Sequence, residues 1–115
     1  VANLSTELGL IYYGEENGFE LASERFREAL AIYTTLSINN PIYYNILIGK
    51  VCYNFSILRI WQLKNKFDTR IKIEGIELIN QGKKALEIYD NSNATKIRYL
   101  EGFETLENLF MAEKK

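Results

Sequence analysis

The sequence predicts an all-α fold in which antiparallel helix pairs stack side by side, and three observations lead to this prediction. The 115 residues include a single proline, so long helices are permitted over most of the chain. Apolar residues recur at steps of three and four, which is the spacing of one helix face. The breaks between the periodic segments are short, and short connections make consecutive helices pack as antiparallel neighbours.

About five helices are expected, and each is bounded by residues that start or stop helices. The expected ranges are 4–14, 19–38, 41–64, 69–90 and 94–113. A turn over residues 15–18 follows from Gly18, because glycine adopts positive φ without steric cost. Pro41 ends the second helix but suits the first turn of the third. Asp68, and either Ser92 or Asn93, are expected N-caps, because their side-chain oxygens can accept from free backbone N–H groups.

The apolar spacing indicates which helix faces are buried. The second helix carries a stripe of alternating small and large residues, and the fourth helix repeats its steps. The third helix carries a complementary ridge of small residues and is apolar almost all round, so we expect neighbours on both its flanks. The stripe is Ala22, Phe26, Ala29, Tyr33 and Leu36; the repeat is Leu78, Gly82, Ala85 and Tyr89; the ridge is Gly49, Cys52 and Ser56.

Composition argues against several classes of function. With 14 basic and 15 acidic residues the net charge is −1, so this segment has no basic stripe with which to contact nucleic acid. Histidine is absent, which removes Ser/His and Cys/His nucleophile pairs and His-containing zinc sites. We therefore expect neither an enzyme nor a metal or cofactor site. Cys52 lies in an apolar run and is expected to be structural, and residues 42–63 hold too many polar groups to span a membrane.

Several residue pairs resemble the tetratricopeptide repeat. Leu8-Gly9 with Tyr12, and Phe55-Ser56, fit the large-then-small pattern of that family's first helix, while Ala22, Phe26 and Ala29 fit its second helix. The spacing between units is longer than the usual period of about 34 residues. The resemblance implies a right-handed superhelical stack whose first helices line a concave groove.

The second half of the chain has a narrower likeness. The segments YNFSILRIWQLKNK (53–66), IELINQGKKALEIYDNSN (76–93) and YLEGFETLENLF (99–110) resemble the C-terminal regulatory domain of Gram-positive quorum-sensing transcription factors. That resemblance implies a cytoplasmic regulator that senses short peptides and has a helix-turn-helix DNA-binding domain upstream. Because the chain lacks an initiating Met, we expect residues 1–115 to be one binding domain from a longer protein.

A set of candidate ligand-binding residues shares one face of the third helix. They are Lys50, Asn54, Ile57 and Trp61, at steps of four, three and four. A lysine can meet a carboxylate, an amide can bond to an extended backbone, and an indole offers a flat apolar surface. The resemblance places this face in the groove, with corresponding positions at Asn3, Glu7, Glu104 and Asn108. Alternatively, Asn54 tethers a neighbouring helix, Lys50 is simply solvated and Trp61 is core.

These patterns lead to two hypotheses of function. The first is a peptide-binding regulatory and self-association domain, in which Arg59 and Arg98 could neutralise an acidic ligand. The second is a constitutive adaptor for a partner protein, without switching. A homodimer through the fifth helix is expected, because that helix carries more large apolar residues than one packing face can hide: Phe103, Leu106, Leu109, Phe110 and Met111.

Overall fold

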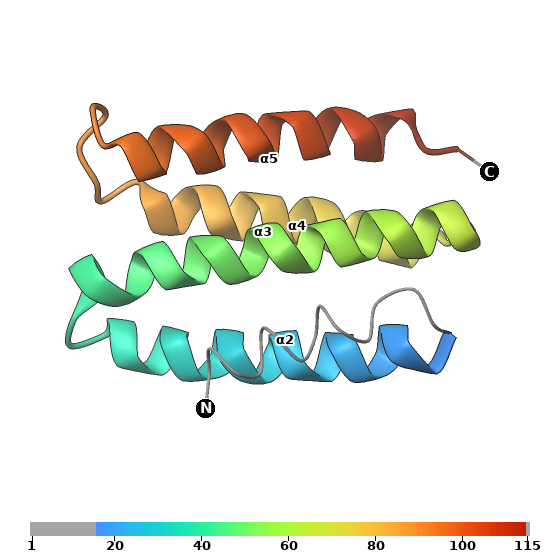
Figure 1. Cartoon of the computed structure of the whole chain (residues 1–115), viewed down its shortest axis with the longest axis horizontal. Helices are drawn as coiled ribbons and strands as arrows, with labels where there is room; N and C mark the ends of the chain where they lie inside the picture. The colour runs from blue at the N-terminus through green and yellow to red at the C-terminus, as the bar shows by residue number, and fades with distance from the viewer. Residues whose placement is uncertain (1–15, 115) are drawn as a thin grey trace.

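The computed structural model describes residues 16–114, and over that range the chain forms four α-helices and no strand (Figure 1). The helices are α2 (Glu16–Ser37), α3 (Pro41–Asn65), α4 (Thr69–Leu86) and α5 (Ala94–Ala112). Consecutive helices run in opposite directions (Figure 1). The all-α prediction is confirmed, while the expected helix over residues 4–14 lies outside the described residues.

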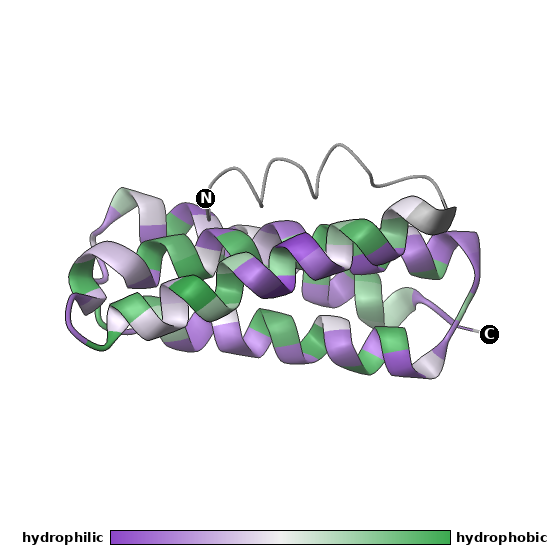
Figure 2. Ribbon diagram, turned by 90° about the horizontal axis from the view of Figure 1, so that it is seen from below, coloured by the Kyte–Doolittle hydropathy of each residue, from purple (hydrophilic) through white to green (hydrophobic). Residues whose placement is uncertain are grey.

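Helix α3 is the central element of the described chain. It packs against α2, α4 and α5, and α5 also packs against α4, whereas α2 packs only on α3 among these helices. The expectation of neighbours on both flanks of α3 is confirmed. Figure 2 shows hydrophilic and hydrophobic residues alternating along the ribbons, and no described helix is long and apolar enough to cross a bilayer.

Each connection between the helices ends in a side-chain cap. The Asn40 side chain accepts from the Tyr43 N–H at 3.4 Å, and Pro41 occupies the first turn of α3. Asp68 accepts from the Arg70 N–H at 2.8 Å, and Asn93 accepts from the Lys96 N–H at 2.9 Å. These contacts satisfy otherwise free donors at the helix starts, and they confirm Asp68 and Asn93 as N-caps.

Three sequence-based expectations about helix ends and burial are wrong. Residues 16–18 lie in the first turn of α2 instead of a turn before it, and Gly18 is buried there, so tertiary contact overrides the preference of glycine for turns. Helix α4 ends at Leu86 because the Glu87 N–H bonds back to the Lys84 carbonyl in a tight final turn. Leu36 is 41% exposed, because it lies in the last turn of α2, next to the exposed connection to α3.

The rest of the predicted stripe and ridge forms the core. Ala22, Phe26, Ala29 and Tyr33 are buried on α2, and Phe26 stacks on Phe55 of α3 with ring centroids 5.2 Å apart. The small residues of α3, which are Gly49, Cys52 and Ser56, are all buried. The core therefore extends on both flanks of α3, as expected for the middle helix of a stack.

Tyr89, three residues after the end of α4, joins the α4–α5 connection to the start of α3. Its hydroxyl accepts from the Ile46 N–H at 2.8 Å and donates to the Ile42 carbonyl. The hydroxyl thus lies between a donor and an acceptor four residues apart in α3, the pair that normally bond directly in a helix. Beside it, Asn45 Nδ2 donates to the Ala85 carbonyl at 3.0 Å. These bonds fix the position of the first turns of α3.

Candidate functional site

The candidate site is the face of α3 that carries Lys50, Asn54, Ile57 and Trp61, and it is accessible. Lys50 and Trp61 are exposed, while Asn54 and Ile57 are half-buried. Because steps of four and three keep residues on one side of a helix, the four side chains form one partly apolar strip. Trp61 is 48% exposed, so the alternative that it is a core residue is wrong.

Asn54 is the polar centre of this strip. Its side chain makes no hydrogen bond with any residue that the structure describes, in contrast to Asn45 on the same helix, which bonds to α4. An amide carries two donor hydrogens and two acceptor lone pairs. In the described chain these remain available to solvent or to a ligand, and the alternative of an interhelix tether gains no support.

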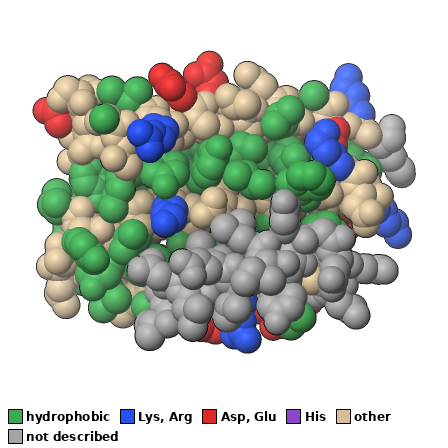
Figure 3. Space-filling view, in the orientation of Figure 1, with side chains coloured by type: hydrophobic (Ala, Val, Ile, Leu, Met, Phe, Trp, Pro, Cys, Tyr) green, Lys and Arg blue, Asp and Glu red, His purple; other side chains and the backbone are tan. Residues whose placement is uncertain are grey.

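Helix α5 borders this strip through aromatic contacts with α3. Tyr53 meets Tyr99 and Phe103 edge-on, with centroid distances of 5.6 Å and 5.8 Å. Gly102 permits this approach, because a Cβ at that position would lie 2.5 Å from the Tyr53 ring. Figure 3 shows an apolar band along the molecule between α5 and α3.

The remaining predicted site residues are not brought together with Asn54. Glu104 and Asn108 are exposed on α5, and each is two residues from the buried Leu106. Residues two apart on a helix point to nearly opposite sides, so both side chains turn away from the core side of α5. Asn3 and Glu7 lie outside the described residues.

Three hollows of the described surface lie on the opposite flank of α3, between α2 and α4. The first has a volume of about 260 Å³ and is lined by Arg27, Leu30, Phe55, Arg59, Glu74, Glu77, Leu78 and Gln81. Two others, of about 250 and 400 Å³, lie toward the two ends of the bundle. None of these three is lined by the strip residues of α3.

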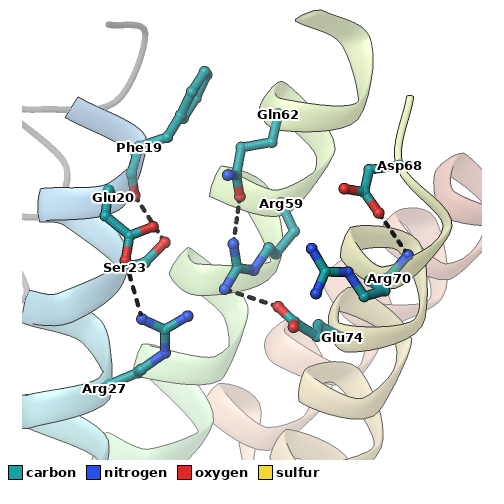
Figure 4. A network of polar contacts seen from close by, with 9 residues as sticks. All are labelled: Phe19, Glu20, Ser23, Arg27, Arg59, Gln62, Asp68, Arg70 and Glu74. Atoms are coloured by element: carbon teal, nitrogen blue, oxygen red, sulfur yellow. Dashed lines mark hydrogen bonds and ion pairs between the residues drawn. The ribbon is translucent and has the colours of Figure 1, made fainter. Parts of the chain in front are cut away.

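Arg59 lies at the first hollow, and the expectation that it meets an acidic ligand is wrong. The residue is only 3% exposed; its guanidinium pairs with Glu74 at 3.0 Å and donates to Gln62 at 2.6 Å (Figure 4). It also lies over the Phe55 ring, 4.7 Å from the centroid. Burial lowers the pKa of Arg59, although the neighbouring Glu74 opposes the shift. The charge of Arg59 is therefore balanced by Glu74 within the protein.

No sequence feature revealed the pairing of Arg59 with Glu74. The two residues belong to different helices. From the sequence alone, an arginine in an apolar run can be either a residue whose charged end is solvated or a residue that contacts a ligand. The Arg59–Gln62 contact, by contrast, joins residues three apart on one helix, a spacing at which side chains are neighbours.

The described residues offer little to nucleophilic or metal chemistry. Burial raises the pKa of the Cys52 thiol to about 12, so the thiolate is not formed near neutral pH. Among the described residues no three His, Cys, Asp or Glu side chains gather as metal ligands. What the α3 strip does present is a free amide, an exposed cation and an indole, which are groups suited to binding.

Comparisons with protein families, with curated proteins and with solved structures found no match.

Proposed function

We propose that this chain binds a short extended peptide, or an extended segment of a partner protein, along the strip of α3 that carries Lys50, Asn54, Ile57 and Trp61. The observation that carries the proposal is Asn54, a half-buried amide with no hydrogen-bond partner among the described residues. An amide surrounded by apolar side chains gains most from a partner that supplies both a donor and an acceptor. An extended backbone supplies both at each residue.

The rest of the strip supports this ligand class. From Lys50 to Trp61 the helix rises by roughly 16 Å, a length that about five residues of extended peptide would cover. Lys50 at one end offers a positive charge, and Trp61 at the other offers an apolar surface with Ile57 beside it. The strip thus favours a peptide with an acidic or carboxylate group at one end and an apolar side chain at the other.

The wider role that we propose is a regulatory and self-association domain of a cytoplasmic bacterial transcription regulator, with a right-handed repeat stack like that of tetratricopeptide proteins. The resemblance of residues 53–66 and 76–93 to quorum-sensing regulators supports this role, as does the central position of α3 among its neighbours. A ligand on α3 could shift helices packed against it and reposition an attached DNA-binding domain. A constitutive adaptor would bind in the same place without such a shift.

The test compares Asn54, on the α3 strip, with Asn80, which lies on α4 away from that strip. Peptides are selected on the wild-type protein from a random short-peptide library, and their affinities are measured by calorimetry. Asn54→Ala should weaken binding by about 1–3 kcal/mol, because backbone groups of the peptide lose their partner. Asn80→Ala, at an exposed position of α4, should leave affinity unchanged.

Two results would count against the proposal. One is a failure to enrich any peptide on the wild-type protein, and the other is selected peptides that bind Asn54→Ala as tightly as wild type. Amide hydrogen exchange with the peptide bound separates the two roles, because an adaptor should show protection only along α3, whereas a regulator should also show changes in α2, α4 or α5.

A further inference from the structure

The hairpin formed by α2 and α3 contains a long segment without charge. Residues 29–49 include no Asp, Glu, Lys or Arg, although such residues make up 25% of the chain. The segment covers the second half of α2, the connection, and the first turns of α3. Burial does not account for it, because many of its side chains are exposed.

Large apolar side chains are exposed where this hairpin turns. Ile38, Ile42 and Tyr43 are 77%, 64% and 59% exposed, and Leu36 is 41% exposed; we call these four residues the hairpin tip. Ile88, which is 45% exposed, lies close by, since it lines the same hollow as Ser37 at the end of α2. Contiguous apolar patches larger than a few hundred Å² are uncommon on monomeric proteins, and the largest apolar patch of a monomer is often functional.

The backbone of the hairpin tip is held in place by hydrogen bonds. The Ile38 N–H bonds to Thr35 and the Asn40 N–H to Leu36, and the Tyr89 hydroxyl bonds to the Ile42 carbonyl. The Tyr43 ring packs edge-on against Tyr44, with centroids 4.8 Å apart. A surface ordered before binding loses less conformational entropy when a partner docks.

We propose that the hairpin tip is the contact surface of a homodimer, so that its partner is the tip of a second copy. In a two-fold dimer the same patch meets itself, and a patch without charges meets itself without like-charge repulsion. The exposed side of α5 is different. It carries Glu101 and Glu104, so two α5 helices packed antiparallel about Glu104 would place those carboxylates face to face, which is unfavourable.

The absence of charge also argues against other partners. Nucleic acid and anionic lipid are attracted by clusters of Lys and Arg, whereas the charges near the segment are mixed in sign. Glu28 and Lys50 flank it in the sequence, and Lys84 and Glu87 line the hollow that Ser37 shares with Ile88. The four side chains of the hairpin tip, even with Ile88 added, make a small surface compared with the ≈800 Å² per partner of a standard interface, so the dimer should dissociate on dilution. The hairpin tip shares no residue with the α3 strip, although Tyr43 lies on the same face of α3 two turns before Lys50. The dimer proposal does not depend on peptide binding.

The experiment is sedimentation velocity on the full chain over a series of concentrations. Wild type should pass from monomer to dimer as concentration rises. Ile38→Asp and Ile38→Lys, tested separately, should each shift the transition to at least tenfold higher concentration, because each places like charges across the two-fold axis. An equimolar mixture of the two variants should dimerise again. Met111→Asp, at a 60% exposed position of α5, should dimerise like wild type.

Circular dichroism of each variant checks that the fold is retained, and Ile38 is exposed enough that a charge there should not disturb it. A wild type that stays monomeric throughout the series overturns the proposal. Dissociation by Met111→Asp with no effect of the Ile38 variants also overturns it, in favour of α5. Binding of monomeric wild type to neutral phosphatidylcholine vesicles, lost in Ile38→Asp, would overturn it in favour of a membrane contact.

Discussion

Helix α3 has two sides of opposite character. Toward α4 and α5, small residues let large side chains approach: a Cβ at Gly49 would lie 2.9 Å from Leu86, and one at Gly82 would lie 2.3 Å from Phe103. On the strip that carries Asn54, the side chains are exposed or half-buried, and the amide is unpartnered among the described residues. Both sides belong to a helix that is apolar almost all round.

The difference shows that hydrophobicity alone does not decide which side of a helix is closed. The closed side combines glycine on one helix with an aromatic ring on the next, so that the backbones come close and the rings fill the space between them. The open strip carries long or polar side chains, which hold a neighbour at a distance and leave room for a ligand. Substitutions on the two sides should therefore differ strongly in their effect on the free energy of unfolding.

The largest effect is expected at Phe103, which is fully buried. Phe103→Ala should lower the free energy of unfolding by about 3–5 kcal/mol, since it removes a large ring and leaves a cavity beside Gly82. Leu109→Ala on the same helix should cost less than about 1 kcal/mol, because Leu109 is 40% exposed. Urea denaturation followed by circular dichroism measures both, and equal losses would show that the closed side does not dominate the stability.

The next effect is expected at Gly82. A new Cβ there would lie 2.3 Å from the tip of the Phe103 ring and 3.0 Å from Cys52 Cβ. Overpacking of this kind typically costs about 1–3 kcal/mol, which exceeds the roughly 1 kcal/mol that alanine gains over glycine in helix propensity. Gly82→Ala should therefore destabilise the protein.

The same substitution in a Phe103→Leu background separates the two contributions. The smaller side chain relieves the contact, so Gly82→Ala should cost less there, and the double-mutant cycle should show a coupling energy. Additive effects would mean that the Phe103 ring moves aside without cost.

Cys52 provides a pH test of the closed side. Its pKa is raised to about 12 by burial, above the roughly 8.5 of an exposed thiol. As pH rises past about 9 the unfolded chain loses the thiol proton while the folded chain keeps it, so stability falls with pH. Cys52→Ala lacks the thiol but retains the tyrosines, which also titrate at high pH. The decline in stability should therefore be steeper for wild type than for this variant. Identical pH profiles in thermal denaturation would mean that the thiol is accessible.

The smallest effect is expected on the open strip. Asn54→Ala should change the free energy of unfolding by less than about 0.5 kcal/mol, because no intramolecular hydrogen bond of the described chain is lost. Asn45→Ala on the same helix should cost about 1 kcal/mol, since Asn45 Nδ2 bonds to the Ala85 carbonyl at 3.0 Å. If Asn54→Ala were the more destabilising of the two, Asn54 would be a structural residue and the α3 strip would not be a binding site.

The sequence by itself determined the features that depend on near neighbours in the chain. The caps at Asp68 and Asn93 and the break before Pro41 follow from bonds within three residues or from the fixed φ of proline. The shared face of Lys50, Asn54 and Trp61 follows from helix periodicity alone. The burial of the small ridge on α3 was also predictable, because an almost wholly apolar helix has to be covered.

Tertiary structure decided whatever depends on residues far apart in the chain. It paired Arg59 with Glu74, placed the Tyr89 hydroxyl in the first turns of α3, and brought Phe103 to Gly82. It also drew residues 16–18 into α2 and turned Glu104 and Asn108 away from the core side of α5. Helix periodicity fixes which residues share a face but not which way the face points, because that direction is set by the packing of neighbouring helices.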